Sequence, residues 1–531
     1  DEKIDLTIVG PEDPLSLGVV DQFEAVGLRI FGASQNAARI ESSKSFAKTI
    51  MEKYGIPTAK GKTFTRLSQA QAYVRKMGTP LVVKADGLAA GKGVIVCSTE
   101  KMAMDALQQI MVERQFGEAG ARVVIEECLV GEEASFLAFT DEKTVLPLPS
   151  SQDHKPALDD DKGLNTGGMG AYSPAPVVDS YLHKRIMNEV MIPMVRGMAA
   201  EGCPYKGVLY AGLMIQGDSI KVLEFNGRFG DPEAQPLLMR LQNDIIPLIE
   251  AVIDERLDMC GLDIDPRAAV CVVMAAGGYP QKYKKGMPIT GIDNANRMRD
   301  VVVFHAGTAL DGKKILSDGG RVLGVTALGD TVELAIQKAY RAVAKINWKN
   351  VHYRTDIGKK ALTRMQMTPQ VGIVMGSDSD LKVMEGALGI FKRFGIPIEM
   401  TVASAHRSPQ RAAEYARSAK QRGLKAIIAG AGHAAHLAGV LAAHTTLPVI
   451  GVPIDSSCLQ GLDALLSTVQ MPPGIPVATV SIGKPGAKNA AIFAVQIMAA
   501  ADDDLAGRLA AFKQEMADQV EKKAEKLKDY R

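Results

Sequence analysis

Glu224 and Asn226 lie two residues apart in the stretch "IKVLEFNGRFGDPE". Alternate residues of a strand share one face, so both oxygen-bearing side chains are expected to point the same way. Carboxylate and amide oxygens suit Mg²⁺ that is held jointly with phosphates. A half-exposed strand with outward polar positions is the plain alternative. The spacing predicts a magnesium site, provided that phosphate-binding groups lie nearby.

Such groups are present upstream, in "VVKADGLAAGKGVIV". Lys84 and Lys92 flank a loop of glycine and alanine between two predicted strands, and Gly91 and Gly93 expose backbone N–H groups beside them. Backbone amides together with ammonium groups suit a polyphosphate. An ordinary hairpin turn with solvated lysines is the alternative. The next predicted strand, "RVVIEECLVGEEASF", ends in acidic residues that could accept hydrogen bonds from an adenine amine and a ribose hydroxyl.

A second group of reactive residue types occupies positions 371–489. "MGSDSD" places hydroxyl and carboxyl groups where a strand enters a helix, which suits a phosphate or ribose, although a simple helix cap has the same sequence. "SAHRSP" brings His406 beside Arg407, and "AGAGHAAHLAG" supplies His436 after a Gly/Ala turn. A lone histidine is more often packed or solvated than catalytic. All three segments follow predicted strands, where open α/β sheets bind ligands.

The elements that position these residues alternate between strand and helix. Residues 1–41 read as strand, helix and strand, after which Ser42 and Ser43 are expected to cap the helix "KSFAKTIMEKYG". Strand-rich sequence follows to about residue 260, then a second strand-rich block over 268–330. The polar stretch "HYRTDIGKKALTRMQMTPQ" lacks periodicity and predicts a linker. The four strands after it, with a helix between each pair of consecutive strands, predict a doubly wound parallel sheet.

Composition limits the classes of function. At roughly 150 residues per domain, 531 residues predict about three or four domains. A net charge of +2 gives no basic field for nucleic acid, and no apolar run approaches the ~18 residues of a membrane span. Six scattered cysteines without a Cys-x-x-Cys pair favour a reducing compartment, which we interpret as the cytoplasm. Small molecules and other subunits are the expected partners.

The chain opens directly on a predicted strand in "DEKIDLTIVGPEDP", without a Met. A strand needs partners, and a βαβ unit takes at least ~30 residues. We therefore expect a truncated α/β domain at the start. A second apparent start, with Met367 before "VGIVMGSDSD", lies two thirds of the way along the chain.

The first half resembles the ATP-grasp ligases, and within them the phosphoribosylamine-glycine ligases. The resemblance is carried by "GPEDPL", "KADGLAAGKGV", "SQDHK", "NTGGMGAYSPAP" and "EFNGRFGDPE" over residues 1 to about 362. It implies ATP as co-substrate and Mg²⁺ or Mn²⁺ as cofactor, with the metal on Glu224 and Asn226 and Arg228 in a catalytic role. The implied ATP-binding residues are Lys84, Gly91, Lys92, Gly93, Glu127 and Glu133. The implied residues of the acceptor site are Asp153, His154, Lys155, Asn165, Thr166, Gly167 and Gly168.

The second half, about 369–515, resembles the class I 5-(carboxyamino)imidazole ribonucleotide mutases, which implies a cofactor-free carboxylate shift with His406 as general acid and base. The implied substrate-binding residues are Ser377, Asp380, Ser404, Arg407, Gly432 and His436. The sequence departs from the family at His433, which stands where a Gly is common, and the role of His433 stays open. The Gly/Ala-rich helices "AAHLAGVLAAH" and "NAAIFAVQIMAAA" predict a homo-oligomer through close helix packing in this half.

These interpretations predict an α/β protein with two enzymes in one chain. The expected segments are a truncated α/β domain (1–43), an ATP-grasp domain (44–262), a ligase C-terminal domain (263–352), a linker (353–369) and a doubly wound, flavodoxin-like mutase domain (370–531). The predicted function is bifunctional purine synthesis. Two alternatives remain: an ATP-grasp carboxylase in place of the glycine ligase, and a truncated first half that only binds or assembles.

Overall fold

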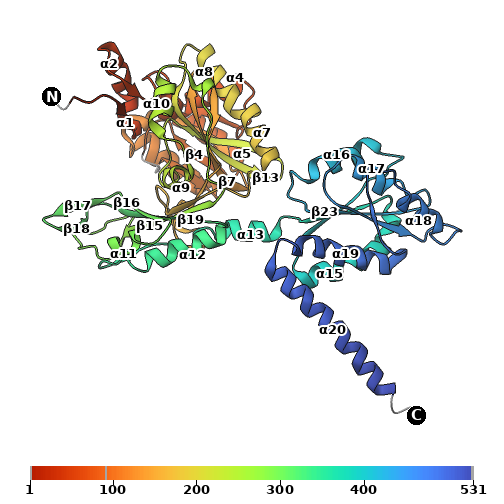
Figure 1. Cartoon of the computed structure of the whole chain (residues 1–531). Helices are drawn as coiled ribbons and strands as arrows, with labels where there is room; N and C mark the ends of the chain where they lie inside the picture. Colours follow the sequence, from red (N-terminus) through yellow and green to blue (C-terminus); the bar gives the residue numbers. More distant parts are fainter. Residues whose placement is uncertain (1–2, 90–92, 528–531) are drawn as a thin grey trace. The chain divides into compact units, whose positions relative to one another are not determined.

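The computed structural model describes residues 3–89 and 93–527 of the chain. The chain divides into two compact parts, which we call the first unit (residues 1–178 and 182–362) and the second unit (residues 363–531 and 179–181). Figure 1 shows the helices and strands of each unit along the colour scale. Within the described ranges, no helix is long and apolar enough to cross a membrane.

The first unit begins with a small parallel sheet in which Thr7 pairs with Ile30. The strand–helix–strand order predicted for residues 1–41 is confirmed. Its elements are β1 (Thr7–Ile8), α1 (Glu12–Ser16), α2 (Val19–Ala25), β2 (Ile30–Phe31) and α3 (Arg39–Ser42).

Helix α4 (Lys44–Lys53) begins where the sequence predicts, because Ser43 caps it. The Ser43 backbone is extended, and its Oγ accepts a hydrogen bond from the N–H of Phe46 at 3.2 Å. This bond satisfies one of the N–H groups that the first turn of a helix leaves without a partner. Ala47 and Ile50 on the buried face then hold the helix to the core.

Two antiparallel four-stranded sheets carry the residues of the first candidate site. Their strand orders are β3-β6-β4-β5 and β14-β13-β7-β8. The first sheet contains β3 (Gly61–Phe64), β4 (Leu81–Ala85), β5 (Val94–Cys97) and β6 (Val123–Glu127). The second contains β7 (Glu132–Asp141), β8 (Val145–Pro147), β13 (Lys206–Gln216) and β14 (Ser219–Asn226).

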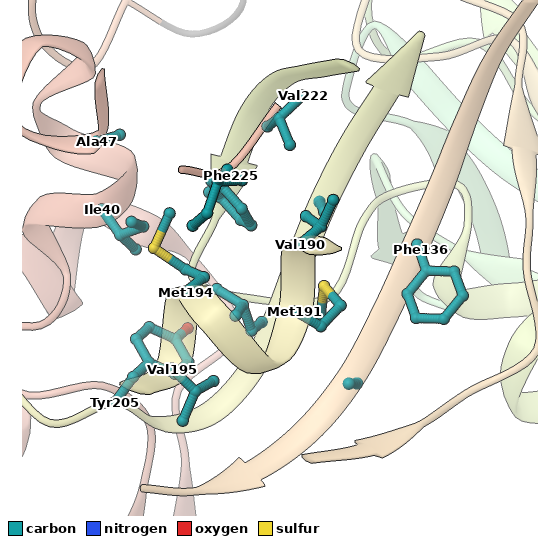
Figure 2. Packing of buried hydrophobic residues seen from close by; sticks show 14 of the residues in the cluster. Ile40, Ala47, Phe136, Val190, Met191, Met194, Val195, Tyr205, Val222 and Phe225 are labelled. Atoms are coloured by element: carbon teal, nitrogen blue, oxygen red, sulfur yellow. The ribbon is translucent and has the colours of Figure 1, made fainter. Parts of the chain in front are cut away.

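A hydrophobic core packs against the second of these sheets. Figure 2 shows Phe136 of β7 and Phe225 of β14 in the same cluster as Met194 of helix α8 (Ile192–Ala200). Phe225 is buried, and its neighbours along the strand point to the opposite face because side chains alternate. Burying one such side chain contributes roughly 1.5–3 kcal/mol. The core therefore fixes the direction in which residues 224 and 226 face.

A third sheet in the first unit has the order β16-β19-β15-β12-β9, and β20 also pairs with β15. Ala171 of β12 pairs with Cys271 of β15, so residues expected in the ATP-grasp segment share a sheet with the following segment. Helix α12 (Val332–Val343), capped by Thr331, packs against this sheet. The strands are β9 (Gln152–Asp153), β12 (Gly170–Ser173), β15 (Ala268–Ala276), β16 (Val301–His305), β19 (Arg321–Gly329) and β20 (Val351–His352).

Part of the expected linker is packed inside the first unit. Arg354 is 1% exposed, and its guanidinium lies 3.0 Å from Asp161 Oδ1 and 2.8 Å from Asp356 Oδ1. Ile357 is buried in the core beneath α12. Helix α13 (Lys359–Met367) follows and contains the division between the units. The correction has a physical reason: polar residues that suggested a linker, such as Arg354 and Lys360, pair with Asp161 of the first unit instead of with solvent.

The second unit is a parallel sheet with the order β22-β21-β23-β24-β25, and all its pairings are parallel. One hydrophobic core lies with α15 and α19, and another with α16 and α17, so both faces are covered as the doubly wound prediction requires. The strands are β21 (Val371–Met375), β22 (Ile398–Val402), β23 (Ala426–Gly432), β24 (Val449–Ile454) and β25 (Ala478–Thr479). The helices are α15 (Leu388–Phe394), α16 (Pro409–Ala419), α17 (Leu437–Ala443), α18 (Leu462–Val469) and α19 (Gly483–Ala499).

The last helix, α20 (Asp503–Leu527), is apolar on one face only in part of its length. Leu505, Leu509 and Phe512 are buried in the core of the second unit. Met516 and Val520, which continue the same stripe, are 43% and 65% exposed. The stripe therefore extends beyond the surface that the second unit itself covers.

Candidate functional sites

Lys84 lies in a buried network between the two four-stranded sheets. Its Nζ is 2.6 Å from Glu126 Oε2 and donates to the carbonyl of Leu223 on β14 at 2.9 Å. Lys48 Nζ lies 2.8 Å from the other oxygen of Glu126. Lys84 and Glu126 share a face because Val82 pairs with Glu126 across β4 and β6. The lysine predicted to bind ATP is thus positioned by a carboxylate that the sequence analysis did not select.

Glu127, the residue predicted to contact the nucleoside, points to the opposite face of β6. It is half-buried, and its Oε1 accepts from the N–H of Lys60 at 2.9 Å and lies 2.6 Å from Lys221 Nζ. Burial raises the pKa of Glu127, but these hydrogen bonds lower it more, so the net shift is downward. Glu127 remains a prediction for nucleoside binding, with two partners already in place.

The base of the glycine-rich loop is fixed to the start of α4. Asp86 is buried and accepts hydrogen bonds from Ser45 N at 2.9 Å and Ser43 Oγ at 3.1 Å. Gly93 must be glycine, because an added Cβ would lie 2.7 Å from Ala89 Cβ. The predicted phosphate-binding residues Gly91 and Lys92 lie outside the described residues.

Lys44 was not selected from the sequence, yet it enters the same site. Its Nζ donates to the carbonyl of Gly87 in the loop at 3.2 Å. Burial lowers the pKa of Lys44, and the nearby Lys84 adds to this, while Glu224 opposes it. A single lysine directly before a serine-rich helix start carries no signal in the sequence that distinguishes it from a surface residue.

Glu224 and Asn226 face the same side of β14, as predicted. Glu224 pairs with Gly212 and Asn226 with Tyr210, beside a bulge at Leu223 of β14. Burial raises the pKa of Glu224, but the ammonium groups of Lys155 and Lys84 lower it more, so the carboxylate is ionised at neutral pH. An ionised carboxylate beside an amide oxygen fits a hard divalent cation.

Among the described residues, no group of three or more His, Cys, Asp or Glu side chains could hold a metal ion. The chain itself thus offers Glu224 and Asn226, and a cation bound there would need further oxygen ligands. Phosphate oxygens are the usual source in nucleotide sites. This pattern matches a metal held jointly with a nucleotide.

Lys155 and Glu133 form an ion pair at the predicted acceptor side, with 2.8 Å between Nζ and Oε2. Burial lowers the pKa of Lys155, but Asp153, Glu133 and Glu224 raise it well above its usual value. Burial raises the pKa of Asp153 to about 7, although the positive charge of Lys155 lowers it. The structure brings these predicted residues together around Glu224, although Glu133 is engaged by a lysine.

The loop that contains Asn165, Thr166, Gly167 and Gly168 is held by a residue from the third sheet. Arg321 Nη1 donates to the carbonyl of Gly167 at 2.8 Å and to that of Asp231 at 2.6 Å, and Arg321 Nη2 lies 2.8 Å from Asp231 Oδ2. Thr166 Oγ1 donates to the carbonyl of Lys155 at 2.8 Å. Asn165 is exposed at the end of β11 (Lys162–Asn165).

Arg228 is held by two carboxylates from the first 41 residues. Its Nε donates to Glu12 Oε2 at 2.7 Å, and its Nη2 lies 3.1 Å from Glu41 Oε1. Glu41 also accepts the N–H of Gly227 at 2.7 Å. Burial lowers the pKa of Arg228, but the two carboxylates raise it more, so the net shift is upward. The opening segment therefore contributes directly to the site.

His154 lies away from the groups just described. It is 1% exposed, its Nε2 accepts from the N–H of Gly358 at 3.4 Å, and its Nδ1 has no hydrogen-bond partner among the described residues. Burial lowers the pKa of His154 to about 3, and the cations Lys360 and Arg354 add to this. Its surroundings favour a packed, neutral imidazole.

The first unit is expected to lose stability on acidification through His154. The unfolded imidazole titrates near pH ~6.5, so between about pH 6.5 and pH 3 the unfolded state holds a proton that the folded state lacks. Stability then falls as pH falls, by up to about 1.4 kcal/mol per pH unit. Urea unfolding across this range should show a flatter pH dependence for His154→Gln than for the exposed control His305→Gln. Equal slopes in both variants would contradict a buried neutral imidazole.

In the second unit, the predicted residues gather at the carboxyl ends of the parallel strands. His406, after β22, and His436, after β23, are hydrogen-bonded, with 2.8 Å between Nε2 and Nδ1. Both side chains are exposed, and their rings meet edge to face. Arg407 N donates to Ser404 Oγ at 3.2 Å. The histidine pair was not foreseen, because strand order alone does not show which residues of neighbouring loops touch.

Ser377 and Asp380 follow β21 and form a capping box. The N–H of Ser377 donates to Asp380 Oδ2 at 3.0 Å, and Ser377 Oγ accepts from Ser379 N at 3.4 Å. Burial raises the pKa of Asp380. The alternative of a simple helix cap is thus correct as local structure. Ser377 Oγ nevertheless lies at the carboxyl edge of the sheet, where a ligand would bind.

Gly432 and His433 form the turn after β23. A Cβ on Gly432 would lie 1.9 Å from Ser456 Oγ, so this turn and the loop after β24 approach as closely as glycine permits. His433 has a φ of +54°, a conformation that favours glycine, and its Nδ1 lies 3.2 Å from Ser456 Oγ. His433 therefore occupies a strained backbone position at the site, where a family glycine would be unstrained.

The first unit has the fold of an ATP-grasp enzyme. Residues 42–234 match the family model described as phosphoribosylglycinamide synthetase, ATP-grasp (A) domain, and residues 1–41 and 269–360 match the N and C domains of the same synthetase. This class implies the use of ATP and a divalent metal ion. Residues 370–519 of the second unit match the family model described as AIR carboxylase.

Relatives narrow the class further. The chain is 54% identical over 367 residues to phosphoribosylamine-glycine ligase of Vibrio vulnificus, covering 69% of this chain and 85% of that protein. It is 56% identical over 364 residues to the ligase of Allochromatium vinosum, covering 68% and 85%. A crystal structure of the Thermotoga maritima ligase is similar, with a TM-score of 0.59, 31% identity, and 67% and 86% of the two chains covered.

The chain belongs to the phosphoribosylamine-glycine ligase family, with an AIR carboxylase domain in the same polypeptide. Campylobacter jejuni biotin carboxylase is also similar, with a TM-score of 0.53 at 15% identity over 66% of this chain and 77% of that one. At that identity the likeness shows the fold alone.

Proposed function

We propose that this chain catalyses two reactions of purine synthesis. The first unit ligates glycine to 5-phosphoribosylamine with ATP, and the second unit converts 5-carboxyaminoimidazole ribonucleotide to 4-carboxy-5-aminoimidazole ribonucleotide. The observation that carries the ligase is the ionised Glu224 beside Asn226, faced by Lys84 and Lys155. The observation that carries the mutase is the His406–His436 pair at the carboxyl edge of a parallel sheet.

Ligation needs two displacement steps and no covalent bond to the enzyme. The glycine carboxylate attacks the γ-phosphorus of ATP, which releases ADP and gives glycyl phosphate. The amine of phosphoribosylamine then attacks the acyl carbon and displaces phosphate. Charge neutralisation and positioning carry both steps, because negative charge accumulates on the transferred phosphoryl group.

Different residues of the first unit are assigned to the phosphates, the metal ion and the acceptor. Lys84 neutralises phosphate oxygens, and its Glu126 partner holds the ammonium in place. Glu224 and Asn226 would hold Mg²⁺ or Mn²⁺, which supplies charge neutralisation when bound. Lys155 and the Arg321-held loop of residues 165–168 lie on the side that we assign to the acceptor. Arg228, oriented by Glu12 and Glu41, is placed to bind an anionic group of the substrates.

The mutase step moves one carboxylate from nitrogen to carbon. A proton is delivered to the exocyclic nitrogen as CO₂ leaves it. The ring carbon then recaptures the CO₂, and a proton is removed from that carbon. One imidazole can do both, since it cycles near neutral pH. We assign this role to His406, with His436 as its hydrogen-bond partner. Ser377, Asp380, Ser404 and Arg407 would hold phosphate and ribose, Gly432 and His436 would close the pocket, and we expect no cofactor.

Substrate-dependent release of ADP tests the ligase proposal directly. Glycine together with phosphoribosylamine should stimulate ADP release, and bicarbonate with 5-aminoimidazole ribonucleotide should not. Stimulation by bicarbonate instead would establish the carboxylase alternative. Absence of both, with an active mutase, would leave the first unit as a binding or assembly module.

We also propose that the second unit self-associates. The small residues of α19, from which the sequence analysis predicted a subunit contact, are used inside the unit: Ala490, Ala491 and Ala494 are buried in its own core. Exposed apolar residues elsewhere, on two different helices, favour association. Apolar side chains on α18 and on the end of α20 are 43–65% exposed, and they are Leu462, Leu466, Val469, Met516 and Val520. Exposed apolar surface of this kind marks interaction sites.

Residues 363–531 expressed alone are expected to fold and to sediment as an oligomer. Leu466→Asp should shift the sedimentation profile toward the monomer, because it would bury a charge in the contact. The matched change Lys420→Asp, at an exposed position beyond α16, should leave the profile unchanged. A monodisperse monomer for the unchanged sequence would contradict this proposal.

A further inference from the structure

A cavity of about 300 Å³ lies in the first unit, between the loop after β15 and the segment that ends at Asn350. None of its lining residues belongs to the set assigned to the ligase site. Its walls are of two kinds. Its lining residues include three lysines, Lys282, Lys284 and Lys349, and three large apolar residues, Tyr283, Met287 and Trp348. Among the described residues, none that lines it is acidic.

The three lysines are not neutralised by the protein. All three are exposed, and none forms an ion pair with a residue in the described part of the chain. The neighbouring Lys285 shows the contrast, because its Nζ lies 3.2 Å from Asp318 Oδ1. Like charges that converge on one concavity raise its potential and attract an anion. An anionic ligand would therefore neutralise charge that the protein leaves unpaired at these three lysines.

Trp348 forms part of the apolar wall of the cavity. Its side chain is 4% exposed, and its indole Nε1–H has no acceptor among the described residues. A buried indole N–H almost always has a partner, since an unmade hydrogen bond costs about 1–3 kcal/mol. Because the indole nitrogen itself has no surface exposed to the cavity, Trp348 and Tyr283 would contribute apolar contacts with a planar group instead of a hydrogen bond.

We propose that this cavity binds a small phosphate ester that carries a planar ring, of nucleoside monophosphate size. A volume of about 300 Å³ lies at the lower end of small-molecule sites. The phosphate lies among the three lysines, and the ring lies against Tyr283, Met287 and Trp348. This site is separate from the ATP site, because its residues follow β15 and α12 instead of β4 and β14.

The cavity also contacts the ligase loop through two tyrosines. Tyr283 packs edge to face on Tyr279, with 6.3 Å between ring centroids, and the Tyr279 hydroxyl accepts the N–H of Gly167 at 3.3 Å. A ligand that shifts Tyr283 therefore acts on the loop of residues 165–168. This second part of the proposal rests on the proposed ligase activity. It predicts a change in the KM for phosphoribosylamine when the cavity is filled, and Tyr279→Phe should remove that change.

The chain has one tryptophan, so its fluorescence reports this cavity alone. Titration of the full chain with AMP should change Trp348 emission saturably, and adenosine or inorganic phosphate alone should bind more weakly. The double variant Lys284→Gln, Lys349→Gln should raise the apparent Kd at least about tenfold, because charge-assisted hydrogen bonds are lost. The control Lys313→Gln, an exposed lysine of the hairpin β17 (Thr308–Asp311) and β18 (Lys314–Ser317), should titrate normally.

AMP bound at the ATP site is distinguished by Lys84→Ala, which should leave the Trp348 titration unchanged. Emission that does not respond to AMP, or a lysine double variant that titrates like the unchanged protein, would overturn the proposed site. Because the emission reports binding whether or not the ligase turns over, an inactive ligase does not affect this result. Binding with an unaltered KM for phosphoribosylamine would overturn only the connection through Tyr279.

Discussion

Glu224→Gln is expected to lower ATP-dependent ligation by about 10²- to 10³-fold while leaving mutase activity unchanged. The loss follows from removing a preorganised charge at the reacting phosphoryl group, for which this is the usual scale. Lys155 and Lys84, which keep the Glu224 carboxylate ionised, would retain their own partners Glu133 and Glu126, so the loss would reflect the metal site and not these lysines. ADP release with glycine and phosphoribosylamine measures the first activity, and formation of the carboxylated imidazole ribonucleotide measures the second.

The matched control for this variant is Asp218→Asn. Asp218 is an exposed residue in the turn between β13 and β14, so its change also removes one negative charge from the same hairpin. It should keep full ligase activity. Magnesium dependence gives a further readout, because Glu224→Gln should need a higher Mg²⁺ concentration for its residual rate. Loss of mutase activity in Glu224→Gln, with the fold preserved, would contradict two independent sites.

Much of this arrangement could be predicted from local sequence. The Ser43 cap, the shared face of Glu224 and Asn226 and the parallel sheet of the second unit depend on period, capping and chain order, which a sequence shows directly. The structure confirms each of them. These features need no knowledge of which distant segments meet.

The residues that the sequence analysis did not select depend on contacts between segments that are far apart in the sequence. Glu126 and Glu127 are adjacent and chemically identical, and only the pairing of β6 with β4 shows which of them faces Lys84. Arg321 reaches the loop at Gly167 across 154 positions of sequence. Glu12 reaches Arg228 across 216. Neither residue type is unusual where it stands, so no local pattern could have selected it.

The expected linker failed for a related reason. Polar composition without periodicity usually means that side chains are solvated, but Arg354 satisfies its guanidinium with Asp161, Asp356 and the carbonyl of Pro156. Buried charges are tolerated when they are paired and hydrogen-bonded in this way. Composition counts polar groups, and it does not show whether water or protein satisfies them.

The second large effect is expected at His406. His406→Asn should lower mutase turnover by about 10²-fold or more, which is the scale for removing a general acid and base. Asn keeps a hydrogen-bonding side chain of similar reach, so ribonucleotide binding should persist while the proton transfers are lost. Single-turnover rates together with equilibrium binding separate these two effects. Because His406 is exposed, thermal unfolding of the second unit should not change.

Three other histidines of the second unit compete for this role, and the structure ranks them. His436 is bonded to His406 at 2.8 Å, so His436→Asn should lower turnover less than His406→Asn does, by disturbing the orientation of its partner. His444 lies at the end of α17 beside Arg417, and His444→Asn is the control that should keep full activity. His433 contacts Ser456 in a strained turn. Normal turnover in His406→Asn together with its loss in His433→Asn would move the assignment to His433.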